Sequence, residues 1–592
     1  MCGKQHSFGL NVSILSSKLV FDDKLTHKTG IIPEEKRIFV RNFQISNMKK
    51  MNIILFLFLL IVSHSIVAQE NTVKNIIVLI PDGTSLPVVS AARWYQRYQQ
   101  PDKTKLNLDP YLCGTILTYS SNAPIGDSAP TTSCYMTGYP SRAGYVSTYP
   151  VADPANDIVP MDPALAYQPL MTLPEASRIV HNKATGLVVT CHFTDATPAD
   201  CAAHSYSRGK KEWIVPQMVH NRLDVVVGGG VSLLNAEQQS YLTAEGYGVL
   251  LNDIDGFRTY RGDKMWALFG DSAMAYNIDR DPLKEPSLAE MTQKAIEKLS
   301  KNENGFFLMV EGSKVDWAAH GNDAAAMITE MLAFDQACGV AFDFAERTGE
   351  TLVVVAPDHG NSGFSIGSIR CPSYSSLTKD EIWEPIARFK ASYDRLSGAL
   401  LQTDASQLKA VMYDLTGIDL SDSEYQKLLQ SSDYSHSPLS EEERKGKKLS
   451  QTINEIVQNH HCFGFTTQGH TGEEVFLAVY DPRGKQFTGH RTNIELNHYM
   501  RQAFALENLE ALTEAYFAKH SDVFDGYSYK IALKNDAPAL EVAYKKNRLE
   551  VRPNTNIVWL NGKAIKLDSV VVYVDKNNTF YLPKALRELL GN

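Results

Sequence analysis

Residues 75–83 read Asn-Ile-Ile-Val-Leu-Ile-Pro-Asp-Gly, a short apolar run that ends just before the carboxylate of Asp82. The run is rich in Ile, Leu and Val and does not alternate with polar residues, as expected of a parallel strand covered on both faces of its sheet. Four further runs share this character, and we expect each to be a buried parallel strand: Gly186–Thr190, Asp224–Val227, Phe306–Val310 and Thr351–Ala356.

Helical patterns lie between these runs. Residues 287–290 (Ser-Leu-Ala-Glu) have the pattern of a capping box and open a helix with an apolar stripe. A second helix is predicted from about residue 324 to residue 348, ending at Gly349. The alternation of strand and helix predicts an α/β fold, a doubly wound and mostly parallel sheet with helices on both faces. Such folds place their sites at the carboxyl ends of the strands.

The rest of the chain differs in pattern from this α/β domain, which we place at residues 69–519. Residues 360–463 are polar, charged and helical in spacing, and we interpret them as a helical insertion into the domain. Residues 520–592 are β-rich. In them, Val558–Leu560 and Lys563–Ile565 flank an Asn-Gly dipeptide, which indicates a tight hairpin. This last segment is predicted to be a small C-terminal β-rich module.

The N-terminal segment has the layout of a secretory signal. Two lysines at positions 49 and 50 precede an apolar run, Ile53–Val62, and a small residue, Ala68, follows. The run is too short to span a bilayer. We interpret residues 48–68 as a signal peptide and residues 1–47 as an over-extended N-terminus. The expected location is periplasmic or secreted, without a stable membrane anchor because no cysteine follows the cleavage site.

Composition narrows the class of protein. The chain has 592 residues, 44% of them hydrophobic and 21% charged, as in a soluble globular protein of more than one ordinary domain. Its net charge of −9 argues against nucleic acid as a specific partner, which would require a basic face. Export implies an oxidising compartment. Of the eight cysteines, Cys2 lies upstream of the signal, so the odd number that follows leaves at least one thiol free.

A candidate nucleophile lies in residues 125–133, Ile-Gly-Asp-Ser-Ala-Pro-Thr-Thr-Ser, where Ser128 follows Asp127 and precedes small residues. A serine that only caps a helix would produce the same local sequence. The surrounding chain favours a site, because acids, imidazoles and a hydroxyl follow the apolar runs or glycine turns in a pattern typical of metal ligands. These candidates are Asp82, Asp195, Thr197, Glu311, Asp316, His320, Asp358, His359 and His470.

With these residues the chain resembles the alkaline phosphatases, of the secreted bacterial type, from Val73 to about Ala518. The order and the approximate spacing of the shared motifs both match. The motifs are Ile80–Gly83, Asp127–Ala129, Asp195–Pro198 continuing to Arg208, Val310–Gly312 continuing to Asp316 and His320, Asp358-His359, and Gly469–Thr471.

The resemblance implies two zinc ions and one magnesium ion. Imidazole ligands suit zinc, and a site made only of oxygen atoms suits the harder magnesium. In this resemblance the first zinc takes Asp316, His320 and His470; the second takes Asp82, Asp358 and His359 with the oxygen of Ser128; and magnesium takes Asp82, Thr197 and Glu311, with Asp195 beside them.

The resemblance also implies a reaction, the hydrolysis of small phosphate monoesters through a phosphoserine at Ser128. Arg208 would hold two non-bridging phosphate oxygens with its planar fork. Asp127, next to the nucleophile, is expected to be a secondary residue of the site. The resemblance is also compatible with a homodimer. The sequence differs from that of some family members at one position near the site. Trp317 replaces the Lys or His that they have there, and its uncharged indole cannot attract phosphate electrostatically.

Three other classes of protein share part of this set of residues. A sulfatase of the same superfamily needs a modified Cys or Ser within a Cys/Ser-x-Pro-x-Arg motif, whereas Thr132 stands at the arginine position here. Phosphodiesterase relatives lack the magnesium site, whereas Thr197 and Glu311 are both present. A non-catalytic protein that only binds phosphate or metal at a surface would have no need of Ser128 together with Arg208. The phosphomonoesterase is therefore the favoured hypothesis.

Overall fold

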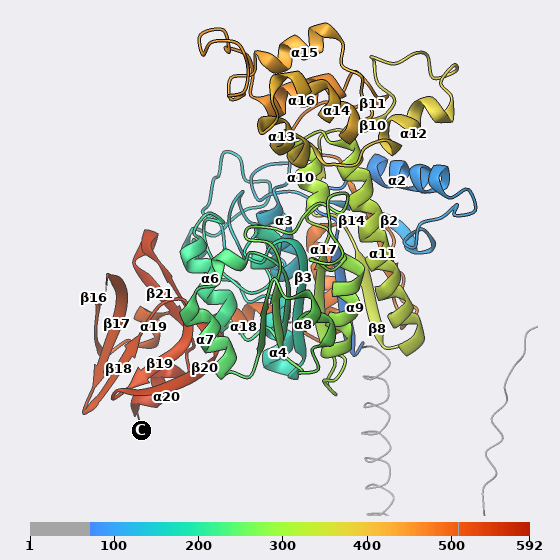
Figure 1. Ribbon diagram of the computed structural model, residues 1–592. Coiled ribbons are helices and arrows are strands. Elements are labelled where there is room, and N and C mark those ends of the chain that lie inside the picture. The colour runs from blue at the N-terminus through green and yellow to red at the C-terminus, as the bar shows by residue number, and fades with distance from the viewer. Residues whose placement is uncertain (1–71, 507, 535, 592) are drawn as a thin grey trace, which may run out of the picture. The chain divides into compact units, whose positions relative to one another are not determined.

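The computed structural model of the protein describes residues 72–506, 508–534 and 536–591. The predicted over-extended N-terminus and signal peptide, residues 1–68, lie outside the described residues. Within the described part, an α/β domain carries a helical insertion and is followed by a β-rich module (Figure 1).

The α/β domain is built on a ten-stranded sheet. Nine strands run in one direction, and only β13 is antiparallel to its neighbours. In spatial order the strands are β14 (Gly489–Thr492), β2 (Leu112–Leu117), β13 (Val475–Tyr480), β8 (Thr351–Val355), β1 (Asn75–Ile80), β7 (Phe306–Glu311), β3 (Ala184–His192), β4 (Val225–Gly229), β6 (Met265–Leu268) and β5 (Gly248–Leu251). The five predicted strands are confirmed as β1, β3, β4, β7 and β8.

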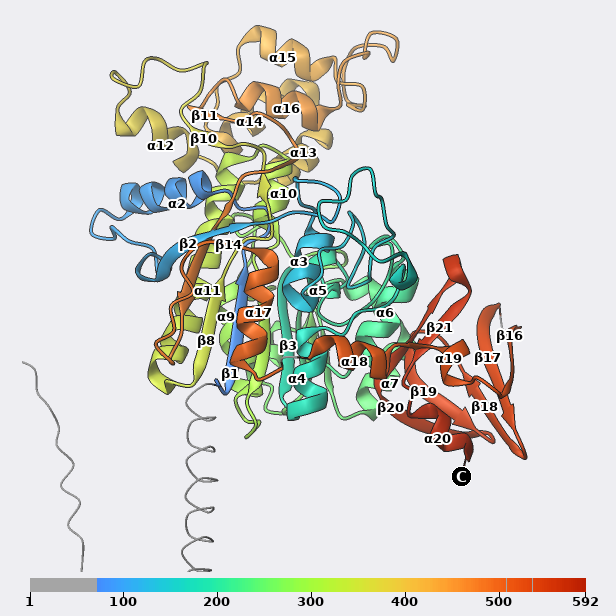
Figure 2. The same ribbon diagram turned by 180° about the vertical axis from the view of Figure 1, so that it is seen from behind.

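The central strands are apolar throughout because both faces of the sheet are covered. Along β1, Ile77 and Leu79 pack in one apolar cluster, whereas Ile76 and Val78 pack in another. Helices α2 (Leu86–Gln99), α9 (Leu288–Leu299) and α11 (Ala324–Thr348) belong to the first cluster. Helices α3 (Ser128–Thr137), α4 (Leu173–His181), α6 (Lys211–His220) and α17 (Asn493–Ala503) belong to the second, on the opposite face (Figures 1 and 2). The predicted doubly wound α/β fold is confirmed.

The two predicted helices are α9 and α11. Ser287 caps α9 by accepting a hydrogen bond from the Glu290 N–H. Helix α11 ends at Gly349, whose φ of 65° lies in the left-handed region that favours glycine. By length and composition α11 could cross a membrane, but most of it is buried in the protein. It is therefore the core helix of the sheet.

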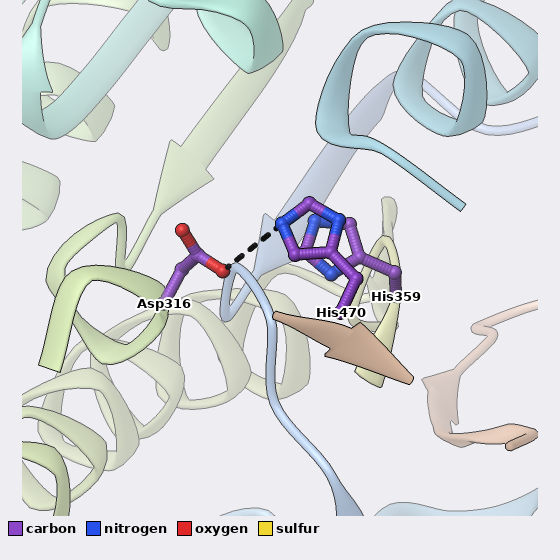
Figure 3. A group of neighbouring side chains, drawn as sticks. All are labelled: Asp316, His359 and His470. Carbon is purple, nitrogen blue, oxygen red and sulfur yellow. Dashed lines mark ion pairs between the residues drawn. The ribbon is translucent and has the colours of Figure 1, made fainter. Parts of the chain in front are cut away.

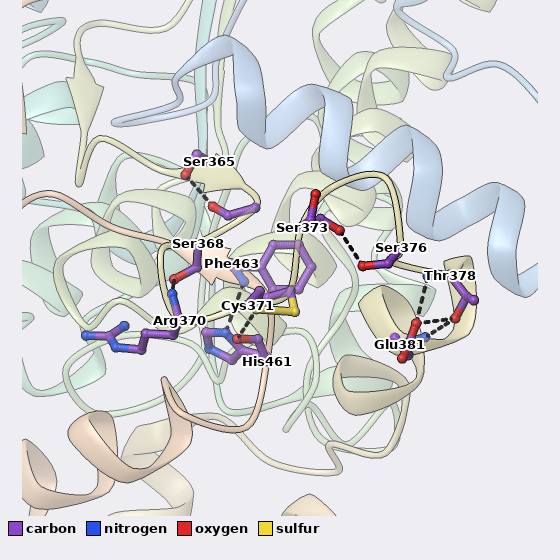
Figure 4. Close-up of a disulfide and its surroundings, with 12 residues drawn as sticks. Ser365, Ser368, Arg370, Cys371, Ser373, Ser376, Thr378, Glu381, His461 and Phe463 are labelled. Carbon is purple, nitrogen blue, oxygen red and sulfur yellow. Dashed lines mark hydrogen bonds between the residues drawn. A yellow bond between two sulfur atoms is a disulfide. The ribbon is translucent and has the colours of Figure 1, made fainter.

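The insertion between β9 (Gly360–Asn361) and β12 (His470–Thr471) is helical, as predicted. Its first and last segments meet at its base, where β10 (Ser365–Ile366) pairs with β11 (Phe463–Gly464). A disulfide between Cys371 and Cys462 joins the same two segments (Figure 4). The helices of the insertion are α12 (Lys379–Ala387), α13 (Tyr393–Leu401), α14 (Leu408–Thr416), α15 (Asp422–Leu429) and α16 (Leu449–Val457).

The C-terminal module is an antiparallel seven-stranded sheet with its own apolar cluster. The predicted Asn-Gly hairpin joins β19 to β20, with φ of 51° at Asn561 and 81° at Gly562. Helix α18 (Leu509–Tyr516) leads into the module, and α19 (His520–Val523) and α20 (Leu586–Gly591) pack within it. Its strands are β15 (Ala518–Lys519), β16 (Ser528–Lys534), β17 (Ala537–Tyr544), β18 (Asn547–Val551), β19 (Thr555–Leu560), β20 (Lys563–Val574) and β21 (Thr579–Leu582).

Candidate active site

The candidate residues gather at the carboxyl ends of β1, β7 and β8, which are neighbours at the centre of the sheet. Ile80 of β1 is in register with Glu311 of β7, and Asp82 follows two residues later. On the other side of β1, Leu79 is in register with Val355 of β8, which leads to Asp358 and His359. The parallel sheet thus brings together carboxylates that are more than two hundred residues apart in the sequence.

One metal-binding group consists of Asp82, Asp358 and His359, all buried, with ligand atoms within 4.8 Å of one another. The Nε2 atom of His359 lies 3.4 Å from Asp82 Oδ1 and 3.5 Å from Asp358 Oδ2. The Oγ atom of Ser128 lies 3.2 Å from the same nitrogen. Ser128 is the first residue of α3, so the positive end of that helix faces the hydroxyl. The structure therefore places the predicted nucleophile against the residues predicted for the second zinc.

A second group adjoins the first. Asp316, His359 and His470 have ligand atoms within 4.8 Å of one another (Figure 3). His320, also predicted for this site, lies beside them. Its Nε2 atom is 3.2 Å from His470 Nε2 and 3.4 Å from Asp316 Oδ2, and His470 Nε2 is 3.8 Å from Asp316 Oδ1. The rings of His359 and His470 stack with centroids 3.7 Å apart, so the two metal-binding groups are in direct contact.

The three imidazoles are oriented alike. The Nδ1 atoms of His320, His359 and His470 lie 2.6, 3.0 and 2.8 Å from backbone carbonyl oxygens. A carbonyl only accepts, so each Nδ1 carries the proton and each Nε2 presents a lone pair. The facing Nε2 lone pairs of His320 and His470 repel each other unless a cation lies between them. This arrangement is the usual one for histidine metal ligands.

The carboxylates around these rings are too close together to be ionised without compensation. Burial, reinforced by Asp358 and Asp316, raises the pKa of Asp82 well above its ordinary value. Burial and the neighbouring Asp195 raise the pKa of Glu311 to about 8. In the described part of the chain, Asp82 Oδ1 and Asp358 Oδ2 are buried without a hydrogen-bond partner. Bound divalent cations would stabilise the ionised carboxylates and satisfy these oxygens, so the residues fit metal ions.

The predicted all-oxygen site shares Asp82 with the first group, and Asp82 and Glu311 are close enough to affect each other's pKa. Thr197 belongs to the short helix α5 (Ala196–Ala199), and its buried Oγ1 has no hydrogen-bond partner within the described residues. Glu311 is the last residue of β7 and is 1% exposed. Orphaned oxygens of this kind suit a hard cation such as Mg²⁺.

Gly83 allows the chain to turn directly after Asp82, close to the carboxylates of Asp316 and Asp358. Its φ is +59°, and a Cβ atom built on it would lie 2.3 Å from Asp316 Oδ1. Any side chain would therefore collide with a candidate ligand. The Gly83 N–H also donates to Asp358 Oδ1 over 3.0 Å, which fixes that carboxylate.

Arg208 is held by two carboxylates, those of Asp127 and of Asp195, the second of which is also a metal candidate. Its Nη1 donates to Asp127 Oδ1 at 2.8 Å and its Nη2 to Asp195 Oδ1 at 2.7 Å. Burial would lower the pKa of Arg208, but Asp195 and Asp127 outweigh it and raise the pKa above its ordinary value. Asp127 is fixed in turn by the Gly144 N–H. Each terminal nitrogen retains a second N–H, so the fork can still bind two oxygens of a phosphate.

Trp317 is half-buried in α10 (Lys314–His320) and packs against both apolar clusters. The ammonium of Lys314 lies 5.1 Å from its ring centroid. Trp317 thus contributes apolar packing next to the candidate ligand Asp316.

The structure also adds residues that the sequence analysis did not single out. Asn361 donates from Nδ2 to Asp316 Oδ1 at 2.6 Å and so orients that ligand. Its position two residues after His359 was the only signal available in the sequence. His204, by contrast, is fully buried and contacts Glu175 and the Ser147 carbonyl, which makes it a structural histidine.

Comparisons with known proteins agree with this geometry. Residues 73–248 and 258–506 match the alkaline phosphatase family. Alkaline phosphatase 3 of Bacillus subtilis is 31% identical over 72% of this chain and 88% of its own length. The repressible alkaline phosphatase of Saccharomyces cerevisiae is 26% identical over 78% of this chain and 87% of its own.

Solved structures give the same result. The cold-active alkaline phosphatase of a psychrophilic Shewanella species has a TM-score of 0.61 and 26% identity, covering 73% of this chain and 99% of that one. The alkaline phosphatase of Thermus thermophilus has a TM-score of 0.63 and 25% identity, covering 74% of this chain and 92% of that one. The chain belongs to the alkaline phosphatase family, as the sequence motifs predicted.

Proposed function

We propose that this protein hydrolyses phosphate monoesters through a phosphoserine intermediate at Ser128. The observation that carries the proposal is the position of the Ser128 hydroxyl, 3.2 Å from His359 Nε2 at the junction of the two metal-binding groups. Family membership supports the same activity.

Two zinc ions and one magnesium ion are proposed as the cofactors. When bound, they would lower the pKa of the serine hydroxyl and stabilise negative charge on phosphate and leaving-group oxygens. The residues proposed to hold them are Asp316, His320 and His470 for one zinc, Asp82, Asp358 and His359 for the other, and Asp82, Thr197 and Glu311, with Asp195 nearby, for magnesium.

The protein's own residues bind and orient the reacting groups. Arg208 binds two non-bridging oxygens of the phosphate, while Asp127 and Asp195 keep its guanidinium in place. Ser128 Oγ attacks phosphorus in line with the leaving alcohol, and its proton is lost to solvent. Water then displaces the serine oxygen in a second in-line step, which releases phosphate with net retention of configuration at phosphorus.

The proposal is tested by measuring metal content together with turnover of p-nitrophenyl phosphate, bis-p-nitrophenyl phosphate and p-nitrophenyl sulfate under the same conditions. We expect zinc and magnesium in the protein, strong preference for the monoester, loss of activity on chelation and recovery on adding both metals. Diester or sulfate turnover equal to monoester turnover would overturn the assignment to phosphomonoesterases.

Export by a signal peptide is proposed as well, supported by the lysine pair, the apolar run and the small residue in residues 49–68. Amino-terminal sequencing of protein recovered outside the cytoplasm should give a start near Gln69. A mature start within residues 1–47 would contradict the proposal.

A further inference from the structure

We propose that Asp575, in the C-terminal module, is a positioning residue for Arg208, an inference that rests on the proposed function. Asp575 begins the turn η5 (Asp575–Asn577) between β20 and β21. The turn contacts the segment that precedes α6. Both views show β21, which follows the turn, beside α6 (Figures 1 and 2). The module would thus complete the phosphate-binding part of the site without contacting substrate.

The contact is made by both oxygens of the Asp575 carboxylate. The Tyr206 hydroxyl donates to Oδ1 at 2.7 Å, and the Lys210 ammonium lies 3.3 Å from Oδ2. Tyr206 and Lys210 stand two residues before and two residues after Arg208. One carboxylate therefore bridges the two sides of the chain segment that presents the arginine.

Aromatic packing reinforces this bridge. The Lys210 ammonium lies 3.7 Å from the ring centroid of Trp213, and the Tyr206 ring packs edge-on against Trp213 at 5.9 Å. On the opposite side, Tyr206 packs edge-on against Tyr145 at 6.3 Å. Tyr145 follows Gly144, which contacts both Arg208 and Asp127 through its backbone. The bridge is therefore continuous with the residues that hold the arginine.

A second contact from the module fixes the same segment further along. Gln217 of α6 donates from Nε2 to Asn554 Oδ1 at 3.0 Å, and its Oε1 accepts from the His204 N–H at 2.8 Å. Asn554 is only 8% exposed, so this contact is shielded from water. The segment 204–217 is thus held to the module at two points, and Arg208 lies within the span of the first.

The energetic consequences of the Asp575 contact should appear in phosphate binding rather than in stability. The Asp575 side chain is 44% exposed, and an ion pair at such a site contributes little to the free energy of unfolding. The arginine fork, however, must match two phosphate oxygens, and a misplacement of ~1 Å can cost ~100-fold in rate. Loosening the segment without displacing it should cost about three- to tenfold.

The test compares Asp575→Ala with a matched control, Asp568→Ala. Asp568 also pairs across to the α/β domain, through Arg222 Nη1 at 3.0 Å, but Arg222 lies beyond the other end of α6. For both variants of the metal-loaded enzyme we would measure the inhibition constant of inorganic phosphate, kcat/KM for p-nitrophenyl phosphate and Tm. Hydrogen exchange of amides 205–213 would report on the segment itself.

We expect Asp575→Ala to raise the phosphate inhibition constant about three- to tenfold, to lower kcat/KM in parallel and to speed exchange in 205–213. Asp568→Ala should change none of these, and Tm should be similar in the two variants. Tyr206→Phe, which keeps the ring and loses the hydroxyl, should reproduce part of the effect. In an Arg208→Ala background, Asp575→Ala should have no further effect on phosphate inhibition, because Asp575 affects phosphate binding only by positioning Arg208.

Two results would overturn the inference. An unchanged phosphate inhibition constant in Asp575→Ala, with a wild type that is an active phosphomonoesterase, would show that the contact is only structural. An equal loss in the Arg208→Ala background would show that Asp575 does not act through Arg208. A wild type that neither cleaves monoesters nor binds phosphate would instead refute the proposed function, and the inference with it.

Discussion

The metal-binding groups and the arginine network occupy neighbouring parts of one site but differ in how far the protein alone satisfies them. Around Asp82 and Asp358, buried oxygens lack hydrogen-bond partners within the described part of the chain, and burial together with the crowded carboxylates raises the pKa of Asp82. Around Arg208, each terminal nitrogen has a carboxylate partner within 2.8 Å. The first region fits cations that would compensate its crowded carboxylates, whereas in the second the guanidinium is already paired with carboxylates before substrate binds.

This difference predicts which substitutions change stability and which change only phosphate binding. Removing a charged group from the metal-binding region should alter both chemistry and stability, since its charges oppose one another within the fold. Removing a group from the arginine network should alter phosphate binding while leaving the fold intact. The predictions below follow this distinction, in order of decreasing effect.

The largest effect is expected from Ser128→Ala. Loss of the nucleophile should reduce kcat for p-nitrophenyl phosphate by ~10³-fold or more, as for other enzymes that lose a covalent nucleophile. Metal content and Tm should stay near those of the wild type, because within the described residues the Ser128 hydroxyl is hydrogen-bonded to His359 Nε2 alone. Activity within a few-fold of wild type would remove Ser128 from the mechanism.

A smaller effect is expected from Arg208→Ala. A charge-assisted bidentate contact contributes roughly 1.5–3 kcal/mol, so kcat/KM should fall about 10- to 100-fold and phosphate inhibition should weaken to match. Arg208→Lys keeps the charge without the fork and should restore only part of the loss. If phosphate inhibits the alanine variant as strongly as the wild type, Arg208 does not bind phosphate.

The metal-free protein should lose stability as pH rises. The pKa of Glu311 is about 8 in the folded state against an ordinary 4.5, so between these values the native state binds a proton that the unfolded state does not. The free energy of unfolding should therefore fall as pH rises from about 5 to 8. Denaturation of the chelated protein across this range measures the slope.

Two controls make the pH experiment specific. Glu311→Gln should reduce the slope, because the amide does not titrate, while buried acids elsewhere, such as Asp323 with a pKa of about 7, keep their contribution. Zinc and magnesium should reduce it as well, since bound cations stabilise the ionised carboxylates. A stability that rises with pH in the chelated wild type would contradict the picture of crowded carboxylates.

The smallest effect is expected from Trp317→Lys. An ammonium beside the site should tighten phosphate inhibition about two- to fivefold, the range for a partly exposed charge pair, and should slow turnover where product release limits the rate. Trp94→Lys, at an exposed position on α2, introduces the same charge as a control. Weaker phosphate binding in Trp317→Lys would mean that the indole acts only by packing.

The central sheet could be predicted because it follows local rules, and the same rules placed the candidate metal ligands near one another. Apolar runs such as Phe306–Val310 are buried on both faces, and candidates such as Asp82 and Asp358 lie within a few residues of a strand end. The antiparallel strand β13 (Val475–Tyr480) and the partner of each cysteine could not be predicted, because its pairing with β2 and β8 and the Cys371–Cys462 disulfide depend on contacts distant in sequence.

The arginine network shows the same limit more clearly. Arg208 could be found from its motif, and Asp127 from its place beside the nucleophile. Nothing in the sequence connects Arg208 with Asp575, which lies more than three hundred residues away in a different type of sheet. The conformation of the arginine segment is set by tertiary contacts, so a motif can identify the residue without identifying what holds it.

The most direct test of the account is to trap the intermediate. The metal-loaded protein would be incubated with labelled phosphate at low pH, quenched in acid and digested, and the labelled peptide sequenced. We predict phosphate on Ser128, the hydroxyl that faces His359 Nε2. Label on Thr131, whose hydroxyl donates to the Asp127 carbonyl, or on the buried Thr132 would contradict the central claim.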